Sequence, residues 1–187
     1  ETVLQHAENT GRLIGILNGC EYQEAPKPPA TRFADLVELC RTRTARWAAV
    51  YSHVPSAHFL AHSRLTEEIF SSNPPEVLLT CVGRVAEQKM LLMCAPGSDG
   101  RSALDRILED IGSHGKLMLL GTGDPVWERK LLDIAARWDN FIFLNGYSDA
   151  CARALYASGD LFLMPSSYEP CGISQMMAMR AGPPCVV

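Results

Sequence analysis

The feature that most limits how this chain folds is an alternation of short apolar segments with amphipathic segments from residue 76 onward. Four apolar segments have the length and composition of buried strands: residues 76–83, 116–121, 140–146 and 160–165. Four segments with helical character follow them in turn: residues 100–115, 124–138, 148–159 and 174–182. Strands that alternate with helices form parallel sheets whose two faces are both covered. The sequence therefore predicts the α/β class, with an open, parallel, Rossmann-like sheet and helices on both faces.

The first 75 residues have a different organisation. Residues 32–52 and 56–70 have helical composition and are separated by Pro55, and a proline-rich connector precedes them at residues 18–30. We therefore expect one partial domain over residues 1–187, with a connector and helical lead-in at 1–75 and a ligand-binding core at 76–187. The chain has no initiator methionine and ends in a strand-like segment, so we expect a truncated piece of a longer protein.

Composition and charge exclude several classes of function. Apolar residues make up 47% of the chain and charged residues 20%, which is typical of a globular domain. The net charge of −4 gives no general attraction to nucleic acid or to an anionic membrane, and no apolar run is long enough to span a bilayer. The seven cysteines form no CxxC pair, which disfavours a zinc or redox motif and favours a reducing compartment.

The segment SSYEPCGIS, residues 166–174, joins the last complete strand to a helix. A strand, a turn that contains glycine and a helix start together present free backbone N–H groups and a helix dipole to an anion. Glu169 lies in this turn. On position alone it is either a site residue or a partner of the helix dipole.

Two cations follow the first predicted strand, Arg84 directly after it and Lys89 five residues later. Ligands of open α/β sheets bind beyond the carboxyl ends of the strands, so these two cations and the helix after Gly172 together suggest a diphosphate pocket. The spacing alone fits two solvated surface charges equally well.

Two other patterns carry less weight. GTGDP at residues 121–125 lacks the third glycine of a dinucleotide fingerprint, and no acidic residue ends the next strand, so we interpret it as a tight turn whose backbone can line a ligand crevice. His53, His58 and His62 have no acidic residue at a ligand-like position beside them. We interpret these histidines as an exposed helix face and expect no metal site.

Five segments, in order along the chain, resemble bacterial glycogen synthases and plant starch synthases. They are GILNGCEY (15–22), VGRVAEQK (82–89), LLGTGDP (119–125), NGYSD (145–149) and SSYEPCGISQMMAMRAGPPCVV (166–187). Those enzymes are retaining glycosyltransferases of the two-domain GT-B fold, so the resemblance implies a C-terminal, donor-binding domain with a nucleotide-sugar-binding core. The resemblance covers about half of the chain and is poor at residues 23–75 and at about 90–112.

The resemblance also implies roles for individual residues. Arg84 and Lys89 are expected to hold the donor diphosphate, Tyr147 to stack on adenine, and Glu169 to position the transferred sugar. The expected catalytic residues are thus Glu169, Arg84 and Lys89. The expected donor-binding residues are Arg84, Lys89, Tyr147, Cys171, Gly172, Ile173 and Ser174, the last three through backbone N–H groups that face the distal phosphate.

The function implied is transfer of glucose from ADP-glucose to an α-1,4-glucan with retention. No cofactor and no metal are expected, because Arg, Lys and the helix dipole neutralise the leaving group in this fold. The expected partners are a nucleotide sugar and a glucan acceptor that binds through a further N-terminal domain, with no nucleic acid and no membrane. Without that domain we expect the chain to transfer no glucose. The expected location is the cytoplasm, or a plastid if the source is a plant or an alga.

The chain departs from the family pattern at several positions. Met90 follows Lys89 where glycine is usual, Ser174 replaces threonine, and the usual His-Arg pair after Tyr147 is missing. Met177 stands where other GT-B branches carry a second carboxylate, as expected for the glycogen synthase branch. Two alternatives stay open: a diverged nucleotide-sugar-binding domain without turnover, and a GT-B transferase for another sugar nucleotide.

Overall fold

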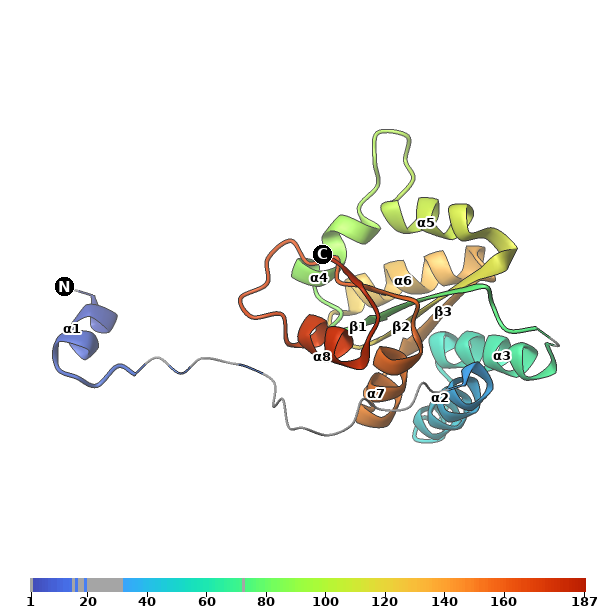
Figure 1. Cartoon of the computed structure of the whole chain (residues 1–187), viewed down its shortest axis with the longest axis horizontal. Coiled ribbons are helices and arrows are strands. Elements are labelled where there is room, and N and C mark those ends of the chain that lie inside the picture. The colour runs from blue at the N-terminus through green and yellow to red at the C-terminus, as the bar shows by residue number, and fades with distance from the viewer. Residues whose placement is uncertain (1, 15, 17–18, 20–31, 72) are drawn as a thin grey trace.

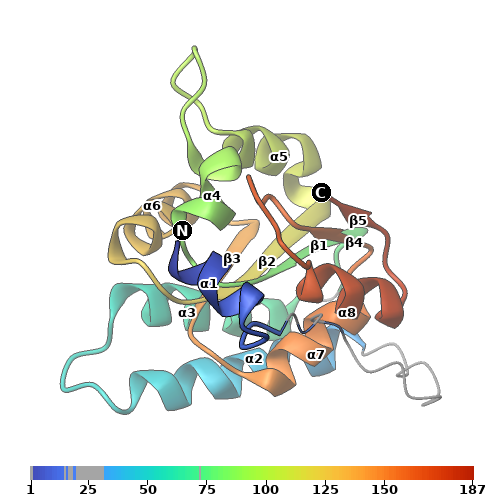
Figure 2. The same ribbon diagram turned by 90° about the vertical axis from the view of Figure 1, so that its left-hand side faces the viewer.

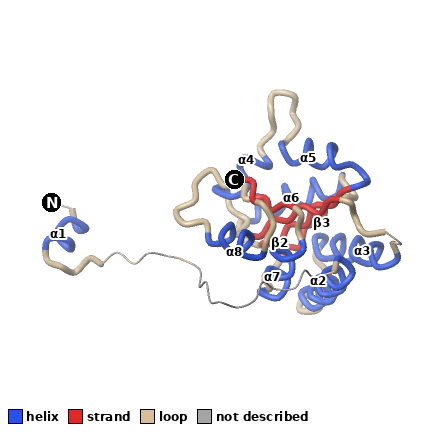
Figure 3. The backbone as a smooth tube through the Cα atoms, viewed as in Figure 1, coloured by secondary structure: helices blue, strands red, loops and turns tan. Residues whose placement is uncertain are grey.

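The computed structural model describes residues 2–14, 16, 19, 32–71 and 73–187 (Figure 1). In this part of the chain, five parallel strands form one sheet with the order β3-β2-β1-β4-β5. The strands are β1 (Val77–Val82), β2 (Gly115–Gly121), β3 (Phe141–Asn145), β4 (Leu161–Leu163) and β5 (Cys185–Val186). They form the central layer, with helices on both sides (Figure 3). Because all of them are parallel, their carboxyl ends lie at one edge of the sheet.

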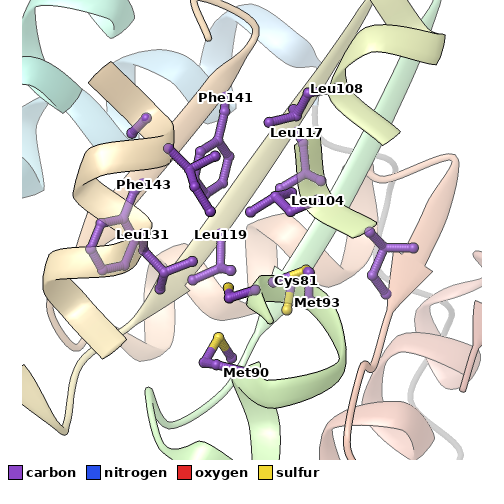
Figure 4. Packing of buried hydrophobic residues seen from close by; sticks show 14 of the residues in the cluster. Cys81, Met90, Met93, Leu104, Leu108, Leu117, Leu119, Leu131, Phe141 and Phe143 are labelled. Carbon is purple, nitrogen blue, oxygen red and sulfur yellow. The ribbon is translucent and has the colours of Figure 1, made fainter. Parts of the chain in front are cut away.

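Three helices cover one face of the sheet: α4 (Glu87–Cys94), α5 (Ala103–Ile111) and α6 (Pro125–Arg137). Their apolar side chains pack with strand residues into a continuous core that includes Leu104, Leu117, Leu131 and Phe141 (Figure 4). Helix α5 begins with a capping box: the Ser102 hydroxyl accepts from the N–H of Asp105, and the Asp105 carboxylate accepts from the N–H of Ser102. The short 3-10 turn η1 (Gly112–His114) then leads into β2.

Four helices cover the other face: α2 (Phe33–Ala48), α3 (Ser56–Phe70), α7 (Asp149–Ser158) and α8 (Ile173–Ala181) (Figures 1 and 2). Leu36 and Leu65 from the α2–α3 pair are fully buried together with Ile142 of the edge strand β3. The guanidinium of Arg64 is also buried there and donates a hydrogen bond to the carbonyl oxygen of Phe141. Helices α2 and α3 are therefore packed onto the sheet.

The predicted α/β class, the parallel sheet and the helices on both faces are confirmed. The structure adds two helices that the sequence analysis did not predict, α1 (Val3–Asn9) and α4. Within the described part of the chain, no helix is long and apolar enough to cross a membrane. Of the segment GILNGCEY, only Ile16 and Gly19 are among the described residues.

The interpretation of the three histidines as an exposed helix face is wrong for His58. Its side chain is only 5% exposed, because α3 is enclosed between α2 and β3. The ring nitrogen Nε2 lies 2.8 Å from the carbonyl oxygen of Asn145, and since a carbonyl oxygen only accepts, Nε2 is the donor. His58 is thus a buried residue that binds the end of β3.

Candidate functional site

A cavity of about 540 Å³ lies at the carboxyl edge of the sheet. The ends of β1, β2 and β3 and the amino-terminal parts of α7 and α8 form its walls. The residues around it are Val82, Gly83, Arg84, Leu120, Gly121, Thr122, Gly146, Tyr147, Ser148, Asp149, Ala152, Arg153, Tyr156, Ile173, Ser174 and Met177. This is the place at which open α/β sheets bind ligands.

The amino end of α8 forms one wall of this cavity. Gly172 precedes the helix with φ of 76°, a left-handed conformation that glycine adopts without steric cost. No described side chain caps the first turn, so the N–H groups of Ile173 and Ser174 are open to a ligand. Both residues line the cavity. Uncapped N–H groups and the positive end of the helix dipole make this wall suited to a phosphate.

Glu169 and Lys89 form an ion pair beside this helix start, with the Lys89 side chain 14% exposed and that of Glu169 26% exposed. The carboxylate also accepts hydrogen bonds from the hydroxyl of Ser166 (3.2 Å) and the N–H of Gly172 (3.3 Å). Burial alone would raise the pKa of Glu169, but the hydrogen bond and charge of Lys89, helped by Gly172 and Ser166, outweigh it and lower the pKa. Glu169 is therefore held as a carboxylate.

The turn that carries Glu169 is fixed to the start of α4. The N–H of Ser167 donates to the carbonyl oxygen of Gln88 at 2.8 Å, and the Gln88 side chain donates to the carbonyl oxygen of Tyr168. Since Gln88 directly precedes Lys89, these bonds set the position of the cation and of the carboxylate together. Helix α4 therefore serves as the support of the turn.

Arg84 and Tyr147 face the same cavity from the ends of β1 and β3. The side chain of Arg84 is exposed. Tyr147 is 74% exposed, and its hydroxyl donates a hydrogen bond to Asp149 at 2.7 Å. The structure thus brings two of the predicted residues onto the cavity wall together with Ile173 and Ser174. Cys171 is half-buried in the turn before α8 and is not among the residues that line the cavity.

The GTGDP turn also reaches the cavity, through Gly121 and Thr122. Its glycines serve close packing: a Cβ on Gly121 would lie 2.1 Å from the carbonyl oxygen of Gly83, and one on Gly123 would lie 2.3 Å from that of Val85. The following helix is capped by Asp124, whose carboxylate accepts from the N–H of Val126 at 2.8 Å. This turn is therefore closed to an anion.

Several residues at the cavity were not found from the sequence. Asp149, Arg153 and Tyr156 all belong to α7 and line the cavity on one side. Their spacing of three to four residues places them on one helix face, but nothing in the sequence showed that this face meets α8. Among the described residues, no group of three or more His, Cys, Asp or Glu side chains could hold a metal ion.

Comparison with known proteins places this geometry in a family. Residues 76–187 match the family of glycosyl transferases group 1. A glycogen synthase of Aliivibrio salmonicida is 33% identical over 172 residues, which covers 91% of this chain and 32% of that protein. A glycogen synthase of Trichodesmium erythraeum is 39% identical over 175 residues, which covers 92% of this chain and 34% of that protein. The chain thus spans about a third of the length of these relatives.

The fold agrees with this family. The catalytic domain of starch synthase IV from Arabidopsis thaliana, solved with ADP and acarbose bound, aligns with a TM-score of 0.55 at 23% identity. The alignment covers 97% of this chain and 34% of that chain. The fold is therefore that of a domain of a GT-B glycosyltransferase. The chain belongs to the glycosyl transferases group 1 family, and its sequence is similar to glycogen synthases.

Proposed function

We propose that this domain binds the donor ADP-glucose in a glucosyltransferase that extends an α-1,4-glucan with retention of configuration. The observation that carries the proposal is a cavity that is lined by Arg84 and by the uncapped start of α8. The Lys89–Glu169 pair does not line this cavity but lies beside the same helix start, where Glu169 accepts from the N–H of Gly172. Cations and a helix amino end suit a diphosphate, and a carboxylate beside them suits sugar hydroxyls. The glycogen synthase relatives support the same choice.

In the proposed complex, Arg84, Lys89 and the N–H groups of Ile173 and Ser174 hold the diphosphate. Tyr147 stacks on the adenine and Glu169 accepts hydrogen bonds from the sugar. The turn at Cys171 and Gly172 lets the backbone approach the distal phosphate. Positive groups then stabilise the charge that develops on the leaving diphosphate, which makes a metal ion unnecessary. The glucan acceptor is proposed to bind outside this domain.

The Lys89–Glu169 pair gives the proposal a specific consequence. A bound phosphate competes with Glu169 for the Lys89 ammonium, so the pair has to open or to share the cation when ADP binds. Removing the carboxylate therefore frees Lys89 for phosphate, whereas removing the ammonium takes away a charge-assisted contact. Such a contact accounts for about tenfold to hundredfold in affinity.

The test is calorimetric titration of the chain with ADP and with UDP, in buffer that contains EDTA. We expect ADP to bind without metal and more tightly than UDP. Lys89→Ala should weaken ADP binding about tenfold to hundredfold, and Glu169→Ala should leave it unchanged or tighter. In the full-length transferase, Glu169→Ala should instead lower kcat. If Glu169→Ala lost ADP affinity as severely as Lys89→Ala, Glu169 would have only a structural role.

We also propose that the protein works in the cytoplasm, or in a plastid if the source is a plant or an alga. The six cysteines among the described residues are all free thiols, which fits a reducing compartment.

A further inference from the structure

The carboxylate of Glu128 links two neighbouring turns, after β2 and after β3, that both contribute to the donor cavity. Glu128 lies in the first turn of α6, and its Oε1 accepts from the hydroxyl of Thr122 and from the N–H of Gly123, both at 2.7 Å. Its Oε2 accepts from the Nδ2 of Asn145 at 3.2 Å. Thr122 and Gly123 follow β2, whereas Asn145 ends β3. One side chain thus bonds to the ends of two neighbouring strands.

Both of these strand ends contribute directly to the donor cavity. Thr122 lines it from β2, and Gly146 and Tyr147 line it immediately after Asn145. The backbone joins the two turns once more, because the N–H of Gly146 donates to the carbonyl oxygen of Gly121 at 3.2 Å. A shift of Asn145 relative to Thr122 would therefore move Tyr147 across the cavity.

The α2–α3 pair holds the same turn as well. His58 donates to the carbonyl oxygen of Asn145 at 2.8 Å. The Trp47 ring lies against Gly146, so closely that a Cβ on this glycine would be 2.7–2.8 Å from three ring carbons. Asn145 and Gly146 are thus held by Glu128, His58 and Trp47 together.

An acidic residue in the first turn of a helix also stabilises that helix through its dipole. This explanation alone does not account for Glu128, whose carboxylate takes three hydrogen bonds from the two turns before and beside its helix. An amide in place of Glu128 would keep the side-chain shape but would present a donor to the Nδ2 of Asn145, so that Asn145 would have to turn its own amide to keep the contact. Stabilisation of the helix dipole and positioning of the two turns therefore predict different results when the hydrogen-bonding groups of Glu128 and Asn145 are exchanged.

We propose that Glu128, with Asn145 as its partner, is a positioning residue for the donor: it sets Tyr147 and Thr122 at the separation that the nucleotide requires. The proposal rests on the proposed function, because it assumes that this cavity takes ADP. It also gives the α2–α3 pair a part in donor binding, since His58 and Trp47 complete the support of the same turn.

The experiment exchanges the hydrogen-bonding groups of the pair in the 187-residue chain and measures ADP binding by calorimetry at pH 8. Glu128→Gln should weaken ADP about tenfold, because the side chain keeps only one acceptor oxygen for three donors and Asn145 has to turn its amide to keep the contact. Asn145→Asp should weaken ADP at least as much, because two carboxylates then face each other. The double variant Glu128→Gln with Asn145→Asp restores a donor–acceptor pair, so its affinity should return to within about threefold of the unsubstituted chain.

A second set of variants, made in a chain that already carries Tyr147→Ala, separates an effect on the position of Tyr147 from an effect on the stability of the fold. If Glu128 acts through the turn that carries Tyr147, then Glu128→Gln should cost much less ADP affinity when Tyr147→Ala is already present. Thermal unfolding of every variant measures stability independently. Asp35→Asn is the control, because Asp35 is also an acid in a first helical turn but pairs with Arg32 on an exposed face of α2. It should leave ADP binding unchanged.

A milder variant, Thr122→Val, removes only one donor to Glu128 and should weaken ADP about threefold even if the exchange variants fold poorly. The inference is overturned if Glu128→Gln and Thr122→Val bind ADP within twofold of the unsubstituted chain. It is equally overturned if the double variant binds no better than the single ones. If the unsubstituted chain itself does not bind ADP, then the proposed function fails and this inference fails with it.

Discussion

Two turns at the same edge of the sheet lead from a strand into a helix, and they use glycine for opposite purposes. In the turn after β2, Gly121 and Gly123 leave room for the neighbouring backbone at Gly83 and Val85, and Asp124 caps the helix. In the turn after β4, Gly172 has no backbone that close, adopts a positive φ, and leads into a helix without a described side-chain cap. Of these two turns, only the one before α8 leaves the first N–H groups of its helix open to an anion.

The largest effect that this comparison predicts is on stability. Gly121→Ala would place a Cβ 2.1 Å from the carbonyl oxygen of Gly83, so the two turns would have to separate. We expect a loss of about 3 kcal/mol or more in the free energy of unfolding, measured by urea denaturation. Gly172→Ala should cost only about 1–2 kcal/mol, for its positive φ. Equal losses in the two variants would contradict the distinction between a packed and an open turn.

The next effect concerns the missing cap of α8. Gly172→Asn supplies a side chain that tolerates positive φ and can accept hydrogen bonds from the first N–H groups of the helix. It should leave stability nearly unchanged but weaken ADP binding about tenfold or more, because the new cap occupies the donors that phosphate needs. Asp124→Ala is the matched variant. It should cost about 1 kcal/mol of stability and no ADP affinity.

The opposite effects of these two variants on ADP binding would contradict this part of the comparison. If Asp124→Ala weakened ADP binding and Gly172→Asn did not, the anion site would lie at α6.

The smallest effect is the pH dependence of stability at the Lys89–Glu169 pair. The pKa of Glu169 is lower in the folded chain than its ordinary value, so the pair stabilises the fold above about pH 4.3, the unfolded value, and this contribution is lost as the pH falls through the folded pKa. In Lys89→Met, burial becomes the dominant influence and should raise the pKa of Glu169.

Urea denaturation between pH 7 and pH 3 measures this effect. The stability of Lys89→Met should fall less steeply toward acid than that of the unsubstituted chain. An identical slope in both proteins would show that Lys89 does not set the pKa of Glu169.

The main elements of the fold were predictable because strands and helices alternate strongly after residue 76. Helix α4 was not, because its eight residues have no capping side chain and little amphipathic contrast. The burial of His58 was not predictable either, since its partner is a carbonyl oxygen 87 residues away. Helical spacing identifies a face but does not identify what covers that face.

The residues of the candidate site also divide into those with a local sequence pattern and those that depend on long-range contacts. Arg84, Lys89, Glu169 and the start of α8 lie in segments whose local pattern, helped by a family resemblance, pointed to the ligand. Glu128 has no such pattern, because its partners come from two different turns. Residues that act through long-range contacts become visible only in the structure.

The most direct test of the account follows backbone amide resonances of the ¹⁵N-labelled chain during titration with ADP. The account predicts that the N–H groups of Ile173 and Ser174 shift most, because they donate to phosphate, and that those of Gly123 and Val126 shift little, because Glu128 and Asp124 already occupy them. Large shifts at Gly123 and Val126 with unchanged resonances at Ile173 and Ser174 would contradict it.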